Sequence, residues 1–148
     1  MAVVIKEFIG RVPASLDTIS KDTLVNTVLV PIAGFSSAIA TDERSGNYLT
    51  RTAGSTCVVY SLSIANTSDS VKNVNVCVLS YDISTNPLAP TPYDFFYIGK
   101  NLPVPESSTL MVQTKTALNA SQALCVIPND ADVAAGVLQA SASIASLA

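Results

Sequence analysis

The sequence has no histidine and no tryptophan, and charged side chains make up only 13% of its 148 residues. Without histidine, the chain lacks the usual general base of Ser-His-Asp and Cys-His catalysis and the commonest metal ligand. An average domain carries about 25% charge, so partner subunits are expected to cover part of this surface, although a surface rich in Ser, Thr and Asn would also account for it. We therefore expect no enzyme, no cofactor and no metal site, and we expect a homo-oligomer.

Cysteine is scarce, and no recognised binding motif is present. The three cysteines, Cys57, Cys77 and Cys125, are an odd number at wide spacing without a CxxC pair, which argues against both a disulfide framework and a zinc site. They are expected to be reduced, buried side chains of a protein assembled in a cytosol. The glycines form neither a dinucleotide-binding motif nor a phosphate loop.

Positive charge is also limited. The net charge is −3 and the eight Lys and Arg residues are scattered, so no basic patch for nucleic acid is expected.

The first seven residues do not resemble a signal peptide, because charges occupy the place of an apolar segment. The longest uncharged apolar stretch, residues 23–41, is interrupted by Asn26, Pro31 and Gly34, which favours strands over a membrane span.

The acidic residues provide the remaining candidates for chemistry. Three close pairs occur in predicted loops, where solvated carboxylates are ordinary. Asp130-x-Asp132 lacks the glycine and the distal glutamate of a calcium loop. We expect all of these acids to be solvated loop charges; the pairs are Asp17 and Asp22, Asp42 and Glu43, and Asp130 and Asp132.

Helical periodicity is nearly absent from the chain, and short β-branched runs separated by turn residues are typical of strands. Residues 1–22 are expected to form an extended N-terminal arm, with a short strand at 3–8. A strand is expected at 23–32, followed over 33–56 by a long loop or a loosely formed hairpin.

Period-two alternation is clearest after Cys57. Val58, Tyr60, Leu62 and Ile64 alternate with smaller residues, and a similar run at 73–78 follows a turn, so we expect these two strands to form a hairpin. Further strands are expected at 93–98, 109–114, 123–127 and 136–145. The fold prediction is an all-β protein: an antiparallel β-sandwich or jelly-roll-like domain spanning 23–148, with the N-terminal arm at 1–22.

The aromatic segment at 93–98 is the clearest candidate contact surface. Alternation places Tyr93, Phe95 and Tyr97 on one side of the strand and Phe96 and Ile98 on the other. A strand that is apolar on both sides is expected to be covered on both, and a sugar-stacking platform is the alternative. The residues predicted to form an interface are Val3, Val4, Ile5 and Phe8 of the arm, with Tyr93, Phe95 and Tyr97.

The stretch from about Ser55 to Ala148 resembles a family of small bacteriophage virion proteins. Three pieces carry the resemblance: TCVVYSLSIANTSDSVKNVNVCVL, FYIGKNLPVPESSTLMV and LNASQALCVIPNDADVAAGVLQASASI. The chain departs from the family's usual turns at Glu106-Ser107, in place of Ala-Gly, and at Ser121-Gln122, in place of Gly-Asp. The resemblance implies a β-sandwich located in the virion and assembled in the host cytoplasm.

The resemblance favours a capsid cement or decoration protein that binds and stabilises the shell formed by the major capsid protein. A tail, neck or baseplate adaptor that contacts other virion proteins is the alternative, and a carbohydrate- or receptor-binding module is a further one. If the 1–22 arm reaches a neighbouring subunit, its deletion should weaken particle binding and leave the domain folded.

Overall fold

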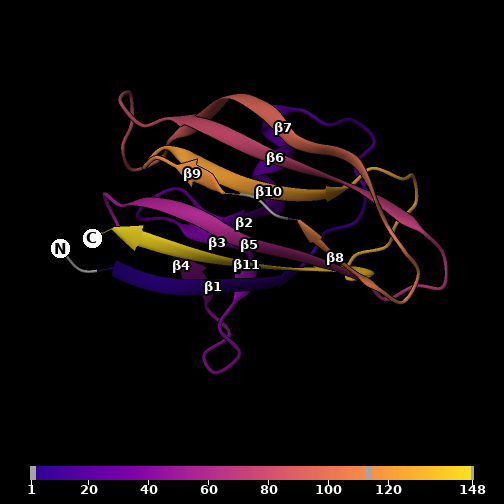
Figure 1. Cartoon of the computed structure of the whole chain (residues 1–148). Helices are drawn as coiled ribbons and strands as arrows, with labels where there is room; N and C mark the ends of the chain where they lie inside the picture. The colour runs from indigo at the N-terminus through magenta and orange to yellow at the C-terminus, as the bar shows by residue number, and fades with distance from the viewer. Residues whose placement is uncertain (1–2, 113–114, 148) are drawn as a thin grey trace.

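The computed structural model describes residues 3–112 and 115–147, which form two antiparallel sheets packed face to face (Figure 1). Sheet A has seven strands in the order β4-β3-β1-β11-β5-β8, with β9 also paired to β5, and sheet B has four in the order β2-β10-β6-β7. The strands are β1 (Val3–Arg11), β2 (Val28–Val30), β3 (Ser36–Thr41), β4 (Tyr48–Thr50), β5 (Thr56–Asn66), β6 (Lys72–Asp82), β7 (Thr91–Val104), β8 (Thr109–Val112), β9 (Thr116–Leu118), β10 (Gln122–Pro128) and β11 (Leu138–Leu147). The prediction of an all-β antiparallel sandwich is confirmed, although residues 113–114 of one expected strand lie outside the described residues.

The main hydrophobic core lies between the two sheets. Phe8, Leu62 and Ile64 of sheet A pack in one buried cluster with Val78 and Val126 of sheet B. Each fully buried side chain of this size contributes about 1.5–3 kcal/mol. This core holds the sheets together and fixes which residues of each strand face outward.

Sheet B is also covered on its other side by the chain's own N-terminal third. Leu24 and Ile32 belong to a second buried cluster with Cys77, Leu79 and Cys125 of sheet B. Seven consecutive residues of β6 are therefore buried, although side chains alternate along a strand. The central strands of sheet B have protein on both faces.

A short helical segment, rather than the start of the strand expected at 23–32, precedes β2. It consists of α1 (Lys21–Leu24) and the single 3₁₀ turn η1 (Val25–Thr27). Ser20 starts the helix with a capping box: its Oγ accepts from the Thr23 N–H, and its own N–H donates to Thr23 Oγ1. The capping box and the burial of Leu24 against sheet B override the strand preference of the β-branched residues.

The expected N-terminal arm is wrong for residues 3–11, because they form β1 inside sheet A. This strand pairs with β11 along its whole length and meets β3 at Gly10 and Ala40. A Cβ at Gly10 would lie 2.6 Å from the Ile39 carbonyl oxygen, so only glycine permits this approach. Phe8, predicted at an interface, is fully buried in the core.

The segment predicted as a long loop or loose hairpin at 33–56 contains the β3–β4 hairpin. Arg51 follows β4 and is fully buried. Its guanidinium donates at 2.8–3.3 Å to carbonyl oxygens of residues 31, 55, 118, 119 and 122. The side chain thereby connects the ends of both sheets, with carbonyl dipoles rather than a carboxylate around its charge.

The predicted hairpin of β5 and β6 is wrong, because β5 belongs to sheet A and β6 to sheet B. The chain crosses between the sheets through a turn that Asn66 holds. Its side-chain NH₂ group donates to the backbone carbonyl oxygens of Ser70 and Val104, and its side-chain oxygen Oδ1 accepts from the Ser68 N–H. The NTSDS sequence is therefore a turn, as predicted, but one that joins sheets rather than paired strands.

Candidate interaction surface

The outer face of sheet A carries large apolar side chains that no other part of the described chain covers. On β1, Val3, Ile5 and Ile9 are 60%, 70% and 52% exposed, and their neighbours Glu7 and Arg11 also point outward. Side chains alternate between the two faces of a strand, and Phe8 faces the core. The odd-numbered residues of β1 therefore face outward. In an antiparallel sheet whose outer face meets water, the outward positions are ordinarily polar.

The apolar surface continues across the neighbouring strands. Strand register places Ile5 beside Ala145, Ala145 beside Val58 and Val58 beside Ala117, so one row across four strands contains only apolar residues. Tyr60 and Met111, 48% and 62% exposed, lie on β5 and β8. We name this surface the A face; its large apolar members are Val3, Ile5, Ile9, Val58, Tyr60 and Met111.

A β-bulge interrupts the alternation of β5. Ser61 pairs with Ser143 and Val59 with the next residue, Ile144, so Tyr60 is the extra residue. The bulge shifts the phase of alternation. Leu62 and Ile64 therefore face the core, whereas Val58 and Tyr60 face outward with Ser61.

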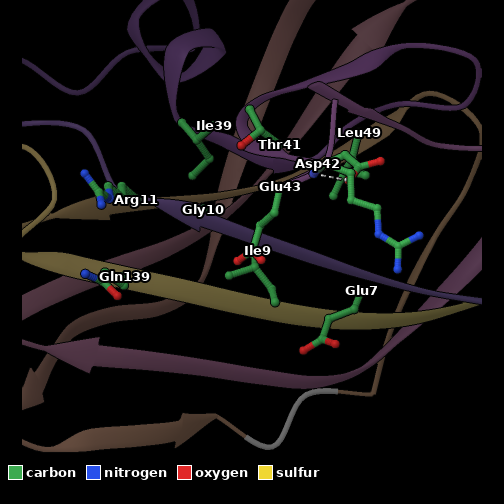
Figure 2. A pocket seen from close by; sticks show the side chains of 11 residues that line it. Glu7, Ile9, Gly10, Arg11, Ile39, Thr41, Asp42, Glu43, Leu49 and Gln139 are labelled. Atoms are coloured by element: carbon green, nitrogen blue, oxygen red, sulfur yellow. Dashed lines mark hydrogen bonds between the residues drawn. The ribbon is translucent and has the colours of Figure 1, made fainter. Parts of the chain in front are cut away.

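A hollow of about 730 Å³ adjoins the A face where the β3–β4 hairpin stands away from β1. Figure 2 shows Glu7, Ile9 and Arg11 of β1 on one side and residues of the hairpin on the other. The connection between β3 and β4 projects from the side of sheet A that faces away from sheet B (Figure 1). It is closed by an Asp42 N–H to Asn47 carbonyl bond and by Asp42 Oδ1, which accepts from the Arg44 N–H at 2.9 Å.

Five charged side chains line this hollow: Glu7, Arg11, Asp42, Glu43 and Arg44. Within the described part of the chain, none of the five forms a salt bridge. Glu7 accepts a hydrogen bond from Ser141 Oγ at 2.9 Å. A chain with few charges thus gathers a mixed-sign group, free of ion pairs among its described residues, beside the A face.

The predicted interface residues of the N-terminal strand divide between its two sides. Val3 and Ile5 are on the A face, whereas Val4 is half-buried on the inner row and Phe8 is in the core. Sequence reasoning missed Ile9, Arg11, Val58, Tyr60 and Met111. Alternation from Val3 would have found Ile9 and Arg11, but nothing in the sequence marked the bulge that exposes Tyr60.

The predicted aromatic residues lie on β7, at the edge of sheet B and away from the A face (Figure 1). Phe95 packs against the second core cluster, and its ring meets Tyr97 edge to face at a centroid distance of 5.7 Å. Tyr93 and Tyr97 are 63% and 36% exposed, and the Lys100 ammonium lies 5.1 Å from the Tyr97 ring centre. The three rings therefore do not make one flat exposed platform.

The buried thiols are held in their protonated form. Burial raises the pKa of Cys77 to about 12 and also raises the pKa of Cys125, its direct partner across β6 and β10. Burial likewise raises the pKa of Cys57, against the effect of the nearby Arg51 charge. A buried thiol with a raised pKa is a poor nucleophile, so these side chains function in packing.

Of the acids considered for chemistry, Asp42 and Asp130 accept hydrogen bonds from backbone amides. Asp130 accepts from the backbone and side-chain amides of Asn73 at 2.6 and 3.0 Å. Across residues 3–112 and 115–147, no group of three or more His, Cys, Asp or Glu side chains is placed to hold a metal ion. In the same residues, no helix has the length and apolar character needed to cross a membrane.

Comparison with known proteins adds no further assignment. No protein-family model matches the chain, and neither a curated protein nor a solved structure is similar to it at a significant level.

Proposed function

We propose that this protein is a structural component of a bacteriophage virion, a cement or decoration protein that binds the capsid shell through the A face. The observation that carries the proposal is a broad outer sheet face with exposed Ile5, Ile9, Tyr60 and Met111. The resemblance of the second half of the chain to virion accessory proteins supplies the class of partner. Binding through such a face works by burial of apolar surface, without chemical conversion of the partner.

The size of the A face suits a stable protein contact. β11 has 10 residues, so the sheet is about 34 Å long at about 3.4 Å per residue, and four strands are about 19 Å wide. The resulting plane of about 650 Å², before the relief of the side chains is added, is close to the roughly 800 Å² per partner of a standard interface.

The hollow contributes specificity to the same contact. Charged groups at the rim of an apolar interface favour partners of complementary charge and disfavour others. Arg11 and Arg44 suit carboxylates of the shell protein, and Glu7 and Glu43 suit its basic groups. The shell segment that enters the hollow is therefore expected to carry charges of both signs.

The test compares two apolar-to-lysine variants in binding to virions assembled without this protein. Ile5→Lys places an ammonium in the middle of the A face, whereas Leu88→Lys makes the same kind of change at an 89% exposed side chain outside that face. We expect the Ile5 variant to bind at least about ten-fold more weakly, since each ten-fold corresponds to about 1.4 kcal/mol and a buried unpaired charge costs more.

The Leu88 variant should bind like the unchanged protein, and circular dichroism should show that both variants are folded. Equal binding by the two variants would contradict the proposal. Immunogold labelling of intact particles then distinguishes a shell location from a tail, neck or baseplate location.

A further inference from the structure

Two of the three cysteines lie side by side on the outer face of sheet B. Cys77 of β6 is the direct partner of Cys125 of β10 in the strand register, and both belong to the buried cluster under the chain's N-terminal third. Side chains of directly opposed strand residues point to the same face of a sheet. The two thiols are therefore neighbours, whereas Cys57 lies in sheet A opposite Ser146 and Leu118.

The hydrogen bonds between β6 and β10 define the geometry of the cysteine pair. The Tyr81 N–H donates to the Ser121 carbonyl at 2.9 Å. Beyond the other side of the pair, the Asn129 N–H donates to the Asn73 carbonyl at 2.7 Å. Both bonds lie an even number of positions from the cysteines in one unbroken register. Hydrogen-bonded pairs recur at every second residue of an antiparallel ladder, so the cysteines form such a pair, with Cα atoms about 5.5 Å apart.

This spacing is within the range of disulfide bonds. Cα atoms joined by a disulfide lie about 4.4–6.8 Å apart, most often about 5.5–6 Å. Cβ atoms of directly opposed strand residues are about 4.5–5.5 Å apart, whereas a disulfide brings them to about 3.8 Å. The pair can therefore close with a small approach of β6 and β10, and the resulting bond is easier to reduce than an unstrained one.

We propose that Cys77 and Cys125 form a reversible disulfide that links β6 to β10 beneath the cover of sheet B. The oxidant is hydrogen peroxide. One cysteine sulfur attacks a peroxide oxygen, which gives a sulfenic acid and releases one water. The other sulfur attacks the sulfenic sulfur, and the S–S bond forms as a second water leaves. Two protein thiols lose two electrons and two protons, and one hydrogen peroxide is reduced to two waters.

Burial makes the reaction slow and dependent on local opening. Both side chains are fully buried, and burial raises the pKa of Cys77 to about 12, so few thiolates are present at neutral pH. Members of the same cluster, among them Val28, Phe35 and Tyr81, line a hollow of about 290 Å³. Val28 pairs with Cys125, so brief opening of β2 admits a molecule as small as hydrogen peroxide.

The surroundings of the protein determine when the bond forms. Cytosolic thiols keep cysteine pairs reduced, whereas oxidising surroundings outside the cell allow disulfides to persist. The bond is therefore expected after a particle leaves its host. That timing rests on the proposed virion location, but the bond itself is a property of the free protein and is tested there.

Disulfide mapping in the purified protein tests the proposal. The protein is treated with hydrogen peroxide under native conditions, the remaining thiols are alkylated, and the digested peptides are analysed by mass spectrometry without reduction. We expect the 77–125 linkage, its loss on treatment with dithiothreitol, and no linkage to Cys57. The same oxidation in urea, which removes the strand register, should give all three possible pairings.

Two single variants provide a matched comparison. Cys57→Ala retains the opposed pair and should form the internal disulfide as completely as the unchanged protein. Cys77→Ala retains two thiols in different sheets and should form none; circular dichroism checks that both variants are folded. Absence of the 77–125 linkage from the native protein, or linkage to Cys57 in equal yield, would overturn the proposal. Because no virion is present, such a failure leaves binding through the A face unaffected.

Discussion

Sheet A and sheet B differ in what lies on their outer faces. The outer face of sheet B is covered by Leu24 and Ile32 from the chain's own N-terminal third. The outer face of sheet A holds side chains of similar character, such as Ile5 and Ile9, with no described segment over them. The protein thus covers the outer face of one sheet by itself and leaves the outer face of the other exposed, which is the basis of the proposed function.

The largest expected effect comes from removing residues 1–22. The deletion takes β1 out of sheet A and takes Leu16 and Ile19 away from the cover of sheet B. We expect the protein to lose its cooperative fold, because both sheets lose buried contacts and β11 loses a neighbour. A thermal unfolding curve by circular dichroism checks this. A deletion product that still unfolds cooperatively would show that residues 1–22 are an arm the domain does not need for folding.

The next effect concerns Arg51, which connects the two sheets. Arg51→Ala leaves five carbonyl oxygens without their donor, and breaking a buried charge network costs about 3–5 kcal/mol. Chemical denaturation should show a loss of that size. Arg44→Ala, at an exposed turn, is the matched control and should change stability by less than about 0.5 kcal/mol.

A direct comparison of the two outer faces follows. Leu24→Ala opens a cavity under the cover of sheet B and should cost about 2–5 kcal/mol. Ile5→Ala removes a side chain that is 70% exposed in the free protein and should change the unfolding free energy by less than about 0.5 kcal/mol. Similar losses for both variants would mean that the A face is covered within the free protein.

The last expected effect is absent at neutral pH, appears only at alkaline pH and comes mainly from sheet B. Burial raises the pKa of Cys77 from 9.0 to about 12 and that of Tyr81 from 10.0 to about 12. The unfolded chain loses these protons first, so the stability they provide is complete below pH 9 and declines as pH rises toward 12. Denaturation midpoints should fall over this range, less steeply in Cys77→Val; a flat profile would contradict this assignment.

The sequence predicted the class of fold because alternation and turn residues are local properties. The prediction failed where the local structure depends on contacts between residues that are far apart in the sequence. β5 and β6 look like a hairpin, yet Asn66 bonds to Val104 and directs them into different sheets. The helix at Lys21 depends on burial of Leu24 as much as on its cap.

The candidate site was found only in part for the same reason. Of the residues predicted at an interface, Val3 and Ile5 are exposed on the A face and Phe8 is buried in the core, because a strand that continues to Arg11 must alternate between core and surface. The exposure of Tyr60 depends on a bulge whose origin lies in the pairing with β11. Neither the partner strand nor the bulge is encoded in the local pattern of β5.

Hydroxyl-radical footprinting of the protein on intact virions measures whether the A face is covered in the particle. Tyr60 and Met111 are reactive, exposed side chains on the A face, and Leu88 is exposed elsewhere. We expect strong protection of Tyr60 and Met111 in the particle relative to the free protein, with Leu88 unchanged. Unprotected Tyr60 and Met111 in particles that retain the protein would show that the A face is not the docking surface.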